Sequence, residues 1–313
     1  MDWLSHLLDI SPVRGQLDIR CSYAAPWRLD EKAAGSGEIP YHLVLAGSAV
    51  LEDPAGGPPQ RLEAGDILLI PDGGAHVLHD GSGLPPQAHH ESRQLNLVVS
   101  ENHGNGERLE LLCGRFVLTA PHDRLLRDYL SSRLIVRGGG SETGHTATGA
   151  QLLHLVSLMR SESAADRIGG RALLDALSTA MFALTLRLAS ESASVPTGWL
   201  ALAANARLQP ALMALFQQPA RPWTLPELAD QCHMSRATLA RQFQETLGRS
   251  PNDLLTDIRM SLAAAALKQT SASTGAVAES VGYQSEAAFQ RVFKQRMGMT
   301  PARWRRQAQA IAR

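Results

Sequence analysis

The C-terminal third of the chain contains one short helical pattern twice, and this repeat restricts the fold more than any other feature of the sequence. Residues 223–251 read WTLPELADQCHMSRATLARQFQETLGRSP. The pattern returns fifty residues later, so that Ser235 aligns with Ser285 and Gly248 aligns with Gly298. Two copies are too few for a solenoid, which needs about three repeats to bury its faces. We therefore expect a pair of similar helical units.

Each copy has the pattern of a helix, a tight turn and a second helix. In the first copy, His233 and Met234 lie at the expected turn, and Ser235 is placed to cap the second helix. Apolar residues recur every four positions along that helix and form its buried stripe, Leu239, Phe243 and Leu247. The other face of the helix is left with short and basic side chains.

These exposed faces carry the residue types that read DNA. A major groove admits one α-helix, in which Arg reads guanine and Gln reads adenine, and hydroxyls at a helix N-terminus bind phosphate. In the first copy we expect DNA contacts from Ser235, Arg236, Thr238, Arg241 and Gln244. In the second copy we expect them from Gln284, Ser285, Gln290, Arg291 and Lys294. Glu286 opposes phosphate near the start of that helix, so the second copy is expected to bind chiefly the DNA backbone.

A predicted helix separates the two copies. Ser250 caps it, Pro251 opens it, and it reaches about Lys268. Its eighteen residues, at about 1.5 Å each, span roughly 27 Å. Successive major grooves on one face of DNA lie about 34 Å apart. One chain can therefore place both second helices in neighbouring grooves.

The distribution of charge divides the chain near the same place. The formal net charge is zero, but residues 205–313 contain 14 Lys and Arg against 7 Asp and Glu, whereas residues 1–204 contain 16 against 23. A basic segment joined to an acidic remainder is typical of a polyanion-binding domain attached to another domain. The alternative is a chance fluctuation of surface charge.

Residues from about 16 to 118 alternate in short apolar runs separated by Gly, Pro and Asp clusters. This spacing predicts a sandwich or barrel of short strands. His42, His76 and His79 fall in or beside these strands and could bind a divalent metal, since neutral imidazole is a common ligand. The alternative is that they are ordinary polar residues at the mouth of a barrel.

Cys21 and Cys113 also lie in predicted strands of this β domain. They could form a disulfide if the strands pair and bring the Cα atoms to about 5.5 Å. The alternative is that each is a buried free cysteine that packs as a small hydrophobe. An oxidant sensor also requires a lowered pKa and exposure of the thiol.

The apolar period becomes helical between residues 122 and 192. Leu177, Met181, Leu184 and Leu188 follow steps of four, three and four. This stripe suits a homodimer seam and packing onto the β domain equally well. Residues 138–149 are expected to form a loop, and residues 191–198 a linker.

Composition bears on the compartment. Three cysteines do not make a disulfide framework, which favours a reducing environment. The N-terminus lacks the basic region of a signal peptide, and no stretch approaches eighteen uninterrupted apolar residues. We therefore expect a soluble, cytoplasmic protein without a membrane partner.

Residues from about 207 to 306 resemble the DNA-binding domain of the AraC/XylS family of bacterial transcription regulators. The resemblance rests on WTLPELA, MSRATLARQF, GRSP, the helix 259–267, AESVGYQSEAAFQRVFK and GMTPARWRR. It implies double-stranded promoter DNA and RNA polymerase as partners, and no enzymatic activity.

The segment GDILLIPDGGAHVLHD resembles the second cupin motif, with Asp80 where an Asn is usual. His42 lies where the first cupin motif would fall, but the His-x-His pair and Glu of metal-using cupins are absent. Residues 1–190 resemble the cupin sensor domain of an AraC branch that includes oxidant-responsive activators. Cys21 and Cys113 fall where that branch tends to carry cysteines, which favours a redox role for the pair.

The predicted fold is an α+β multidomain chain. It comprises a cupin-like β-barrel at 1–120, a helical layer at 121–192, a linker at 193–206, and an all-α domain at 207–313 with two helix–turn–helix motifs joined by a linker helix. We expect a DNA-binding transcription activator whose cupin-like domain senses a small molecule, a metal or an oxidant. The competing hypotheses are a cupin-type metalloenzyme with a DNA-binding tail and an architectural DNA binder. The cofactor is left open between none and a divalent metal.

Overall fold

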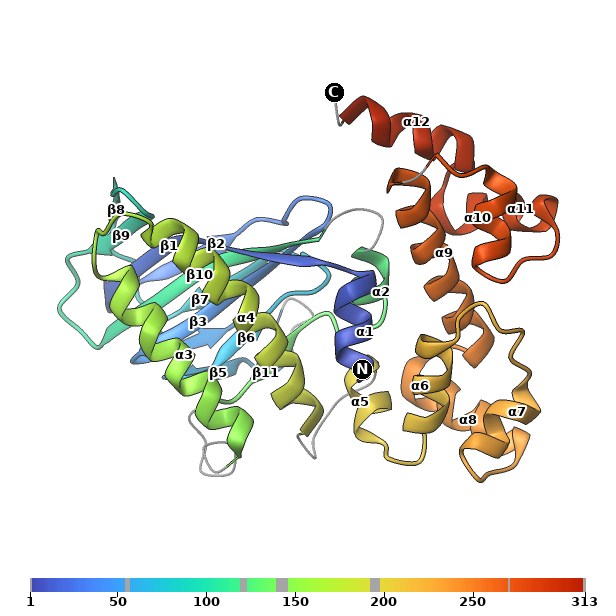
Figure 1. The fold of residues 1–313 in the computed structure, drawn as a ribbon. Helices are drawn as coiled ribbons and strands as arrows, with labels where there is room; N and C mark the ends of the chain where they lie inside the picture. The colour runs from blue at the N-terminus through green and yellow to red at the C-terminus, as the bar shows by residue number, and fades with distance from the viewer. Residues whose placement is uncertain are drawn as a thin grey trace. The chain divides into compact units, whose positions relative to one another are not determined.

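The computed structural model describes residues 2–53, 57–118, 123–138, 146–191, 198–269 and 271–311, excluding the side chains of residues 123–124 and 308–311. The chain forms two compact units (Figure 1). The β unit consists of Val13–Leu118 and Leu130–Ser192. The helical unit consists of Met1–Pro12, Thr119–Tyr129 and Ala193–Arg313.

The β unit contains two sheets. Within the described residues, the larger sheet has seven strands in the order β11-β6-β3-β10-β1-β9-β8, and the smaller has four in the order β2-β7-β4-β5. The larger sheet comprises β1 (Val13–Ala24), β3 (Glu38–Ala46), β6 (Ile67–Leu69), β8 (His89–Arg93), β9 (Val98–Asn102), β10 (Arg108–Leu118) and β11 (Leu134–Val136). The smaller comprises β2 (Arg28–Glu31), β4 (Ser48–Leu51), β5 (Gln60–Glu63) and β7 (His76–His79). Buried side chains of both sheets form one core, including Val44, Leu51, Leu62, Leu78 and Leu111.

Strands β1 and β10 form the longest pair of the larger sheet. They run antiparallel, from Val13 opposite Leu118 to Ala24 opposite Arg108, with one irregularity after Leu17. β1 also pairs with β9 in parallel, and β10 pairs with β3. These two strands therefore lie at the centre of the sheet, where every backbone donor and acceptor of the ladder can find a partner.

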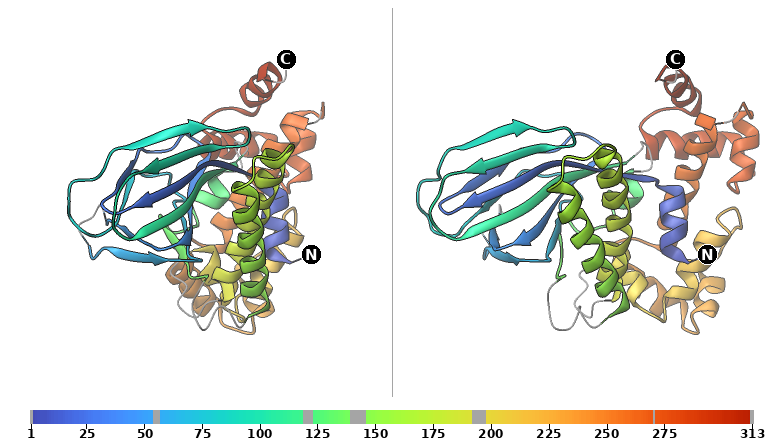
Figure 2. Two further views of the ribbon diagram at one scale, coloured as in Figure 1. Left: turned by 90° about the vertical axis from the view of Figure 1, so that its left-hand side faces the viewer. Right: turned by 60° about the vertical axis from the view of Figure 1, so that its left-hand side comes forward.

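Helices α3 (Ala147–Ser163) and α4 (Gly170–Glu191) lie side by side, with α4 against the larger sheet (Figures 1 and 2). A Cβ added to Gly15 would lie 2.5 Å from the Cβ of Ser178, so the close approach of α4 to β1 requires glycine there. The backbone N–H of Gly15 donates to Thr179 Oγ1 at 2.8 Å, and the hydroxyls of Tyr41 and Ser178 are 2.8 Å apart. These bonds fix α4 on the sheet.

The apolar stripe of α4 packs within the β unit. Leu174, Met181 and Phe182 are buried, and the Phe182 ring lies 4.7 Å from that of Phe116 on β10. Among the described helices, only α4 is long and apolar enough to cross a membrane, with a mean hydropathy of 1.5. Since it packs on β1 and β10, its surroundings are those of a core helix. Of the stripe expected from the sequence, Met181 and Leu188 are buried and Leu177 and Leu184 are half-buried, so packing onto the β domain is observed and the homodimer seam stays a prediction.

The helical unit surrounds a buried tryptophan. Its helices are α1 (Trp3–Ile10), α2 (Asp123–Arg127), α5 (Trp199–Ala204), α6 (Gln209–Gln217), α7 (Leu225–Gln231), α8 (Arg236–Leu247), α9 (Pro251–Gln269), α10 (Thr274–Ser280), α11 (Glu286–Met297) and α12 (Pro301–Ile311). The Trp199 ring stacks on Phe216 at 5.4 Å and lies 5.1 Å from the Tyr129 ring. The backbone N–H of Trp199 donates to the Tyr129 carbonyl at 2.9 Å.

The two units divide the chain differently from the boundaries expected from the sequence. Helix α1 belongs to the helical unit, because Leu4, Leu7 and Ile10 are buried and the helix contacts α6 and α9. Helix α5 lies within the expected linker 193–206, where Trp199 and Leu202 are fully buried. Residues 139–145 of the expected loop and 192–197 of the expected linker lie outside the described residues.

The predicted fold class is confirmed. A sheet-rich domain is followed by two long helices and by a helical domain with two helix–turn–helix motifs. The helix expected at 251–268 is observed as α9 over Pro251–Gln269.

Candidate nucleic-acid interface and buried thiol cluster

The first helix–turn–helix motif consists of α7, a turn and α8. Thr224 caps α7 in a reciprocal capping box with Glu227, whose carboxylate accepts from the Thr224 backbone N–H at 2.8 Å. Hydrogen bonds from Thr224, together with Arg221, lower the pKa of Glu227 to about 2. His233 has a φ of +50°, and the Met234 N–H donates to Ala229 O at 3.0 Å, so the turn lies at the expected residues.

Helix α8 presents the residues expected to read DNA. Ser235 caps the helix by accepting from the Thr238 N–H at 3.1 Å, and the two hydroxyls are 2.9 Å apart. Arg236, Arg241 and Gln244 are exposed. In the described part of the chain neither Arg236 nor Arg241 has a carboxylate within ion-pair distance. Both guanidinium groups are therefore available to a ligand.

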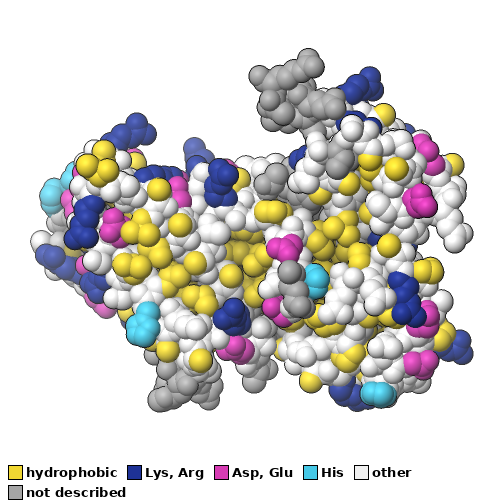
Figure 3. All heavy atoms as spheres, in the orientation of Figure 1, with side chains coloured by type: hydrophobic (Ala, Val, Ile, Leu, Met, Phe, Trp, Pro, Cys, Tyr) yellow, Lys and Arg dark blue, Asp and Glu magenta, His cyan; other side chains and the backbone are white. Residues whose placement is uncertain are grey.

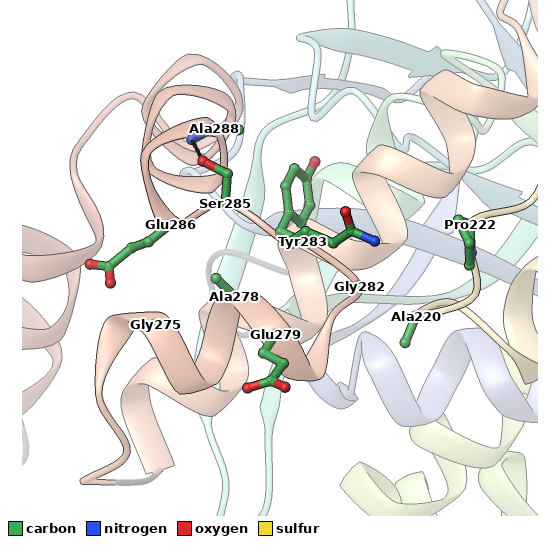
Figure 4. Close-up of a pocket in the computed structure, with 11 residues that line it drawn as sticks. Ala220, Pro222, Gly275, Ala278, Glu279, Gly282, Tyr283, Ser285, Glu286 and Ala288 are labelled. Carbon is green, nitrogen blue, oxygen red and sulfur yellow. Dashed lines mark hydrogen bonds between the residues drawn. The ribbon is translucent and has the colours of Figure 1, made fainter.

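The second motif consists of α10, a turn and α11. Ser285 caps α11 by accepting from the Ala288 N–H at 3.3 Å (Figure 4). The Gln290 amide donates to the Glu286 carboxylate at 2.9 Å, so this pair occupies part of the exposed face. The remaining residues expected to contact DNA are also exposed: Gln284, Arg291 and Lys294.

Helix α9 holds both motifs through ion pairs at Asp257. This carboxylate lies 3.4 Å from Arg249, just after α8, and 3.2 Å from Arg296, near the end of α11. Tyr129 donates its hydroxyl proton to Asp257. Burial raises the pKa of Asp257, while the Tyr129 hydrogen bond and the two Arg residues oppose that shift. The ends of both motifs and the segment after α2 therefore meet at one carboxylate.

The two cysteines expected in the β domain lie together in its core. Cys21 on β1 pairs with Leu111 of β10, which places Cys113 two residues further along the facing strand. Both are free and buried, with exposed fractions of 3% and 8%. A hydrogen-bonding contact with Cys21, and burial, raise the pKa of the Cys113 thiol well above its usual range. The two thiols are thus buried and free, as in the packing alternative, and their burial and the raised pKa of Cys113 differ from the exposure and lowered pKa expected of an oxidant sensor.

A chain of buried rings extends from Cys113. His42 Nδ1 is 3.1 Å from Cys113 Sγ, His42 Nε2 is 2.7 Å from His76 Nε2, and His76 Nδ1 is 3.0 Å from the Gly74 carbonyl. Burial, and to a smaller degree His76, lower the pKa of His42 to about 3. The carbonyl only accepts, so in the neutral chain His76 donates to Gly74, His42 donates to His76, and Cys113 donates its thiol proton to His42.

The structure brings His42 and His76 together but places His79 elsewhere. Side chains alternate along β7, so His76 faces the core and His79 faces the other side. There His79 lies 3.7 Å from Glu52 and accepts from the Gly81 N–H at 2.9 Å. Neither His42 nor His76 lies at a solvent-filled mouth, since both are buried. No group of three ligating side chains suited to a metal is found among the described residues.

Some residues of these sites were not expected from the sequence. The contacts of His42 with His76 and Cys113, and the hydrogen bond from Tyr129 to Asp257, join residues from 34 to 128 positions apart. Cys232, expected to be a core residue, is indeed buried. The signal that could have indicated the ion pairs is the repeat itself, because an Arg stands near the end of each second helix and faces the same connecting helix.

Comparisons with known proteins agree with this arrangement. A family model described as Cupin matches residues 2–191, and one described as Helix-turn-helix domain matches residues 228–307. An uncharacterised HTH-type transcriptional regulator of Haemophilus influenzae is 30% identical over 98% of this chain and 99% of its own. HTH-type transcriptional regulator MtrA of Neisseria gonorrhoeae is 28% identical over 98% and 99%. RCS-specific HTH-type transcriptional activator RclR of Escherichia coli is 27% identical over the whole length of both chains.

Proposed function

This chain belongs to the AraC-type transcriptional regulators that carry a cupin domain. We propose that α8 and α11 bind the two halves of a promoter site. We also propose that a buried pair of thiols senses an oxidant. DNA binding follows from the family. The two-part site, the residues that contact it and the nature of the signal are the content of the proposal.

The DNA-contacting residues fall into two groups. Arg236, Arg241 and Gln244 are exposed along α8 and suit base edges in the major groove, where a good bidentate contact discriminates by about 1–3 kcal/mol. The groups nearer the phosphates are the capping hydroxyls and the side chains of α11: Ser235, Thr238, Gln284, Ser285, Gln290, Arg291 and Lys294. This division follows from Glu286, which holds Gln290 and leaves α11 fewer free side chains for bases.

The observation that carries the sensing proposal is the placement of Cys21 and Cys113 as diagonal neighbours on β1 and β10, in the core of the β unit. A two-electron oxidant such as hypochlorous acid oxidises one thiol to a sulfenic acid. The oxidant is reduced to chloride, and one proton is released. The second thiol then attacks that sulfur, a disulfide forms, and one water is released. Two electrons leave the pair for each molecule of oxidant.

The surroundings of the pair restrict which oxidants can react. The thiolate is the nucleophile in thiol oxidation, and the raised pKa of Cys113 keeps that form scarce. His42, with a pKa near 3, accepts a hydrogen bond from the thiol but does not hold its proton. Weak oxidants should therefore react slowly and strongly electrophilic ones rapidly. RclR, which is named as RCS-specific, aligns with this chain over its whole length.

Disulfide formation would change the pairing of β1 with β10. Diagonal neighbours on antiparallel strands have Cα atoms about 7–8 Å apart, whereas a disulfide requires about 4.4–6.8 Å. β1 continues directly from α1, and β10 leads toward α2 and Tyr129. Within the helical unit, α1 and α2 contact α9 and Tyr129 bonds to Asp257. A shift of either strand is thereby passed along the chain to the helix that joins the two motifs.

We further propose RNA polymerase and a second copy of the chain as partners. RclR is named a transcriptional activator, and activation of transcription acts on RNA polymerase. For the second, hydrophobic side chains gather over α3 and α4 (Figure 3), where Leu153, Leu158 and Leu173 are 39–47% exposed. Analytical ultracentrifugation of Leu158→Glu beside the unchanged protein tests the dimer, since a buried charge would dissociate it.

Thiol trapping tests the sensing proposal. Full-length protein is treated with equimolar hypochlorous acid or hydrogen peroxide, digested without reductant, and analysed by mass spectrometry. We expect a Cys21–Cys113 disulfide with the first oxidant and a change in promoter affinity of about 5- to 150-fold, the usual range of allosteric coupling. Cys21→Ser and Cys113→Ser should abolish the response, and Cys232→Ser, a buried cysteine of the other unit, should retain it. Two free thiols after oxidation would refute the redox proposal and leave DNA binding intact.

A further inference from the structure

Arg259 on α9 binds the loop that precedes the first helix–turn–helix motif, at residues 219–221. Its Nε donates to the Pro219 carbonyl at 2.6 Å, and its Nη2 donates to the carbonyls of Arg221 at 2.8 Å and Ala220 at 3.4 Å. Three successive carbonyls of the segment between α6 and α7 thus accept from one side chain. A planar guanidinium can serve several acceptors in a fixed geometry, which a Lys ammonium cannot.

The same side chain contacts the second motif. The Arg259 guanidinium lies 5.7 Å from the centre of the Tyr283 ring, in the turn between α10 and α11. Tyr283 is itself anchored, because its N–H donates to Ala278 O at 2.9 Å and its ring meets Phe289 edge-on at 5.6 Å. Arg259 therefore lies between the entry loop of one motif and the turn of the other.

The two motifs also touch directly beside Arg259. Gly282 has a φ of +87°, and a Cβ added to it would lie 2.2 Å from the carbonyl oxygen of Ala220. Ala220 and Pro222 line one side of a groove of about 850 Å³, and Gly282 and Tyr283 line another part of it (Figure 4). The turn of the second motif thus abuts the loop of the first, with no room for a side chain between them.

The Arg259 guanidinium contacts the entry loop and the Tyr283 ring. Its hydrogen-bond acceptors among the described residues are backbone carbonyls, and no carboxylate of those residues forms an ion pair with it. The side chain is half-buried, and burial lowers its pKa. Holding a charged group out of water costs free energy unless hydrogen bonds compensate, and here the carbonyls of Pro219, Ala220 and Arg221 supply them. These contacts join the loop before the first motif to the turn of the second motif, and so restrict movement of one motif relative to the other.

We propose that Arg259 is a positioning residue that sets the distance and angle between α8 and α11, and thereby the one spacing of half-sites that the protein accepts in DNA. This inference rests on the proposed two-part reading. One base pair added between half-sites moves the second by about 3.4 Å and turns it by about a tenth of a helical turn. Two motifs locked together cannot follow that change, whereas two motifs joined only by α9 could adjust to it.

The experiment measures affinity against spacing. Duplexes that bind the full-length protein are first selected from a randomised library, and one base pair is then inserted or deleted between the two halves of the selected site. Dissociation constants are determined for the unchanged protein and for Arg259→Lys and Gly282→Ala. Gly298→Ala is the matched control, because Gly298 has a φ of +74° in the same motif but nothing within 4 Å of its added Cβ.

For the unchanged protein we expect each altered spacing to weaken binding at least about tenfold, as a mismatched contact does. Arg259→Lys and Gly282→Ala should reduce that difference to about threefold or less, by losing affinity for the selected spacing while binding the altered duplexes nearly as before. Gly298→Ala should keep the full spacing dependence, even though it carries similar backbone strain. Affinity for a duplex with the first half-site alone should be the same in all four proteins.

The outcomes separate this inference from the proposed function. If library selection yields no site with two halves, the two-part reading fails and the role of Arg259 fails with it. If the unchanged protein discriminates spacings and both variants discriminate them equally well, Arg259 does not set the spacing and the two-part reading stands. Loss of binding to the single half-site by a variant indicates misfolding of the first motif, and the other variant then decides the result.

Discussion

The two helix–turn–helix motifs have similar second helices, but they differ in the turn before that helix and in their exposed side chains. The turn residues with a positive φ are His233 and Gly282, two residues before Ser235 and three before Ser285. Helices α8 and α11 each have twelve residues and each follows a serine cap. Each ends at a glycine in the left-handed conformation, Gly248 with a φ of 72° and Gly298 with a φ of 74°. Phe243 and Phe293 are fully buried at equivalent positions. The repeat in the sequence therefore preserves the structure that holds each helix in place.

The difference between them begins in the first turn. Arg236 in α8 corresponds to Glu286 in α11. A carboxylate at a helix N-terminus stabilises the helix through its dipole, but it repels phosphate. Glu286 also holds the Gln290 amide. The first motif thus leaves its first turn to a ligand, whereas the second uses part of that turn for its own stability.

Loss of the equivalent aromatic residues tests whether the two motifs are equally dependent on their cores. Phe243→Ala and Phe293→Ala should each lower the free energy of unfolding of their motif by about 3–5 kcal/mol, because each leaves a cavity. Hydrogen exchange of the backbone amides measures this motif by motif. Leu225→Ala, at a partly exposed position, should change it by less than about 0.5 kcal/mol. Unequal losses for the two Phe variants would show that the similar second helices conceal different stabilities.

Removal of one arginine from each motif tests the proposed division of labour. Arg236→Ala should weaken binding to the selected site by about 1–3 kcal/mol and relax the preference at one base pair. Arg291→Ala should weaken binding to all sequences alike and reduce the dependence of log affinity on log salt by about 1. Titration of a panel of single-base variants at several salt concentrations measures both effects. Base-specific loss for Arg291→Ala would reverse the assignment.

The capping serines separate stability from DNA contact. Ser235→Ala should cost about 1 kcal/mol of stability, since the Thr238 N–H loses its acceptor. Ser235→Asp keeps a good cap, so stability should be retained while the carboxylate weakens DNA binding. The same pair at Ser285 provides the comparison with the second motif. Thermal unfolding and DNA affinity are measured together, and undiminished affinity of Ser235→Asp would place that residue away from phosphate.

Neutralising Glu286 should produce the smallest change in DNA affinity, and this change should be an increase rather than a loss. Glu286→Gln removes a negative charge from the first turn of α11, so DNA affinity should rise by about 0.3–1 kcal/mol at low salt. The matched control is Glu245→Gln, an exposed residue in the last turn of α8. A gain that persists at high salt would indicate a new hydrogen bond rather than the loss of repulsion.

The parts of the structure that depend on local sequence could be predicted. The capping serines, the turn at His233 and Met234, and the left-handed ends at Gly248 and Gly298 follow from neighbouring residues, and all are observed. The extent of α9 was likewise set by Pro251 at its start. Such features are determined by backbone conformation within a few residues.

The parts that depend on distant residues could not be predicted in the same way. Whether His42 meets Cys113 depends on the register of β3 against β10, and a shift of one residue would place the ring on the other face. The separation of His79 from His76, by contrast, follows from their odd spacing along β7, because side chains alternate along a strand. The assignment of α1 to the helical unit was not predicted. Its three buried leucine and isoleucine side chains show that the helix has an apolar face, but the sequence does not indicate that this face packs on α6 and α9.

The chain passes between its two units at Pro12, Leu118, Tyr129 and Ser192. During synthesis α1 emerges before α6 and α9 exist. Its apolar face therefore cannot be buried against them until most of the chain has been synthesised. A chimaera that exchanges the C-terminal domain at residue 207 would join α1, α2 and α5 of one regulator to α6–α12 of another. Domain exchange in this architecture therefore has to carry three separate pieces of chain together, and a single crossover leaves the interior of the helical unit mismatched.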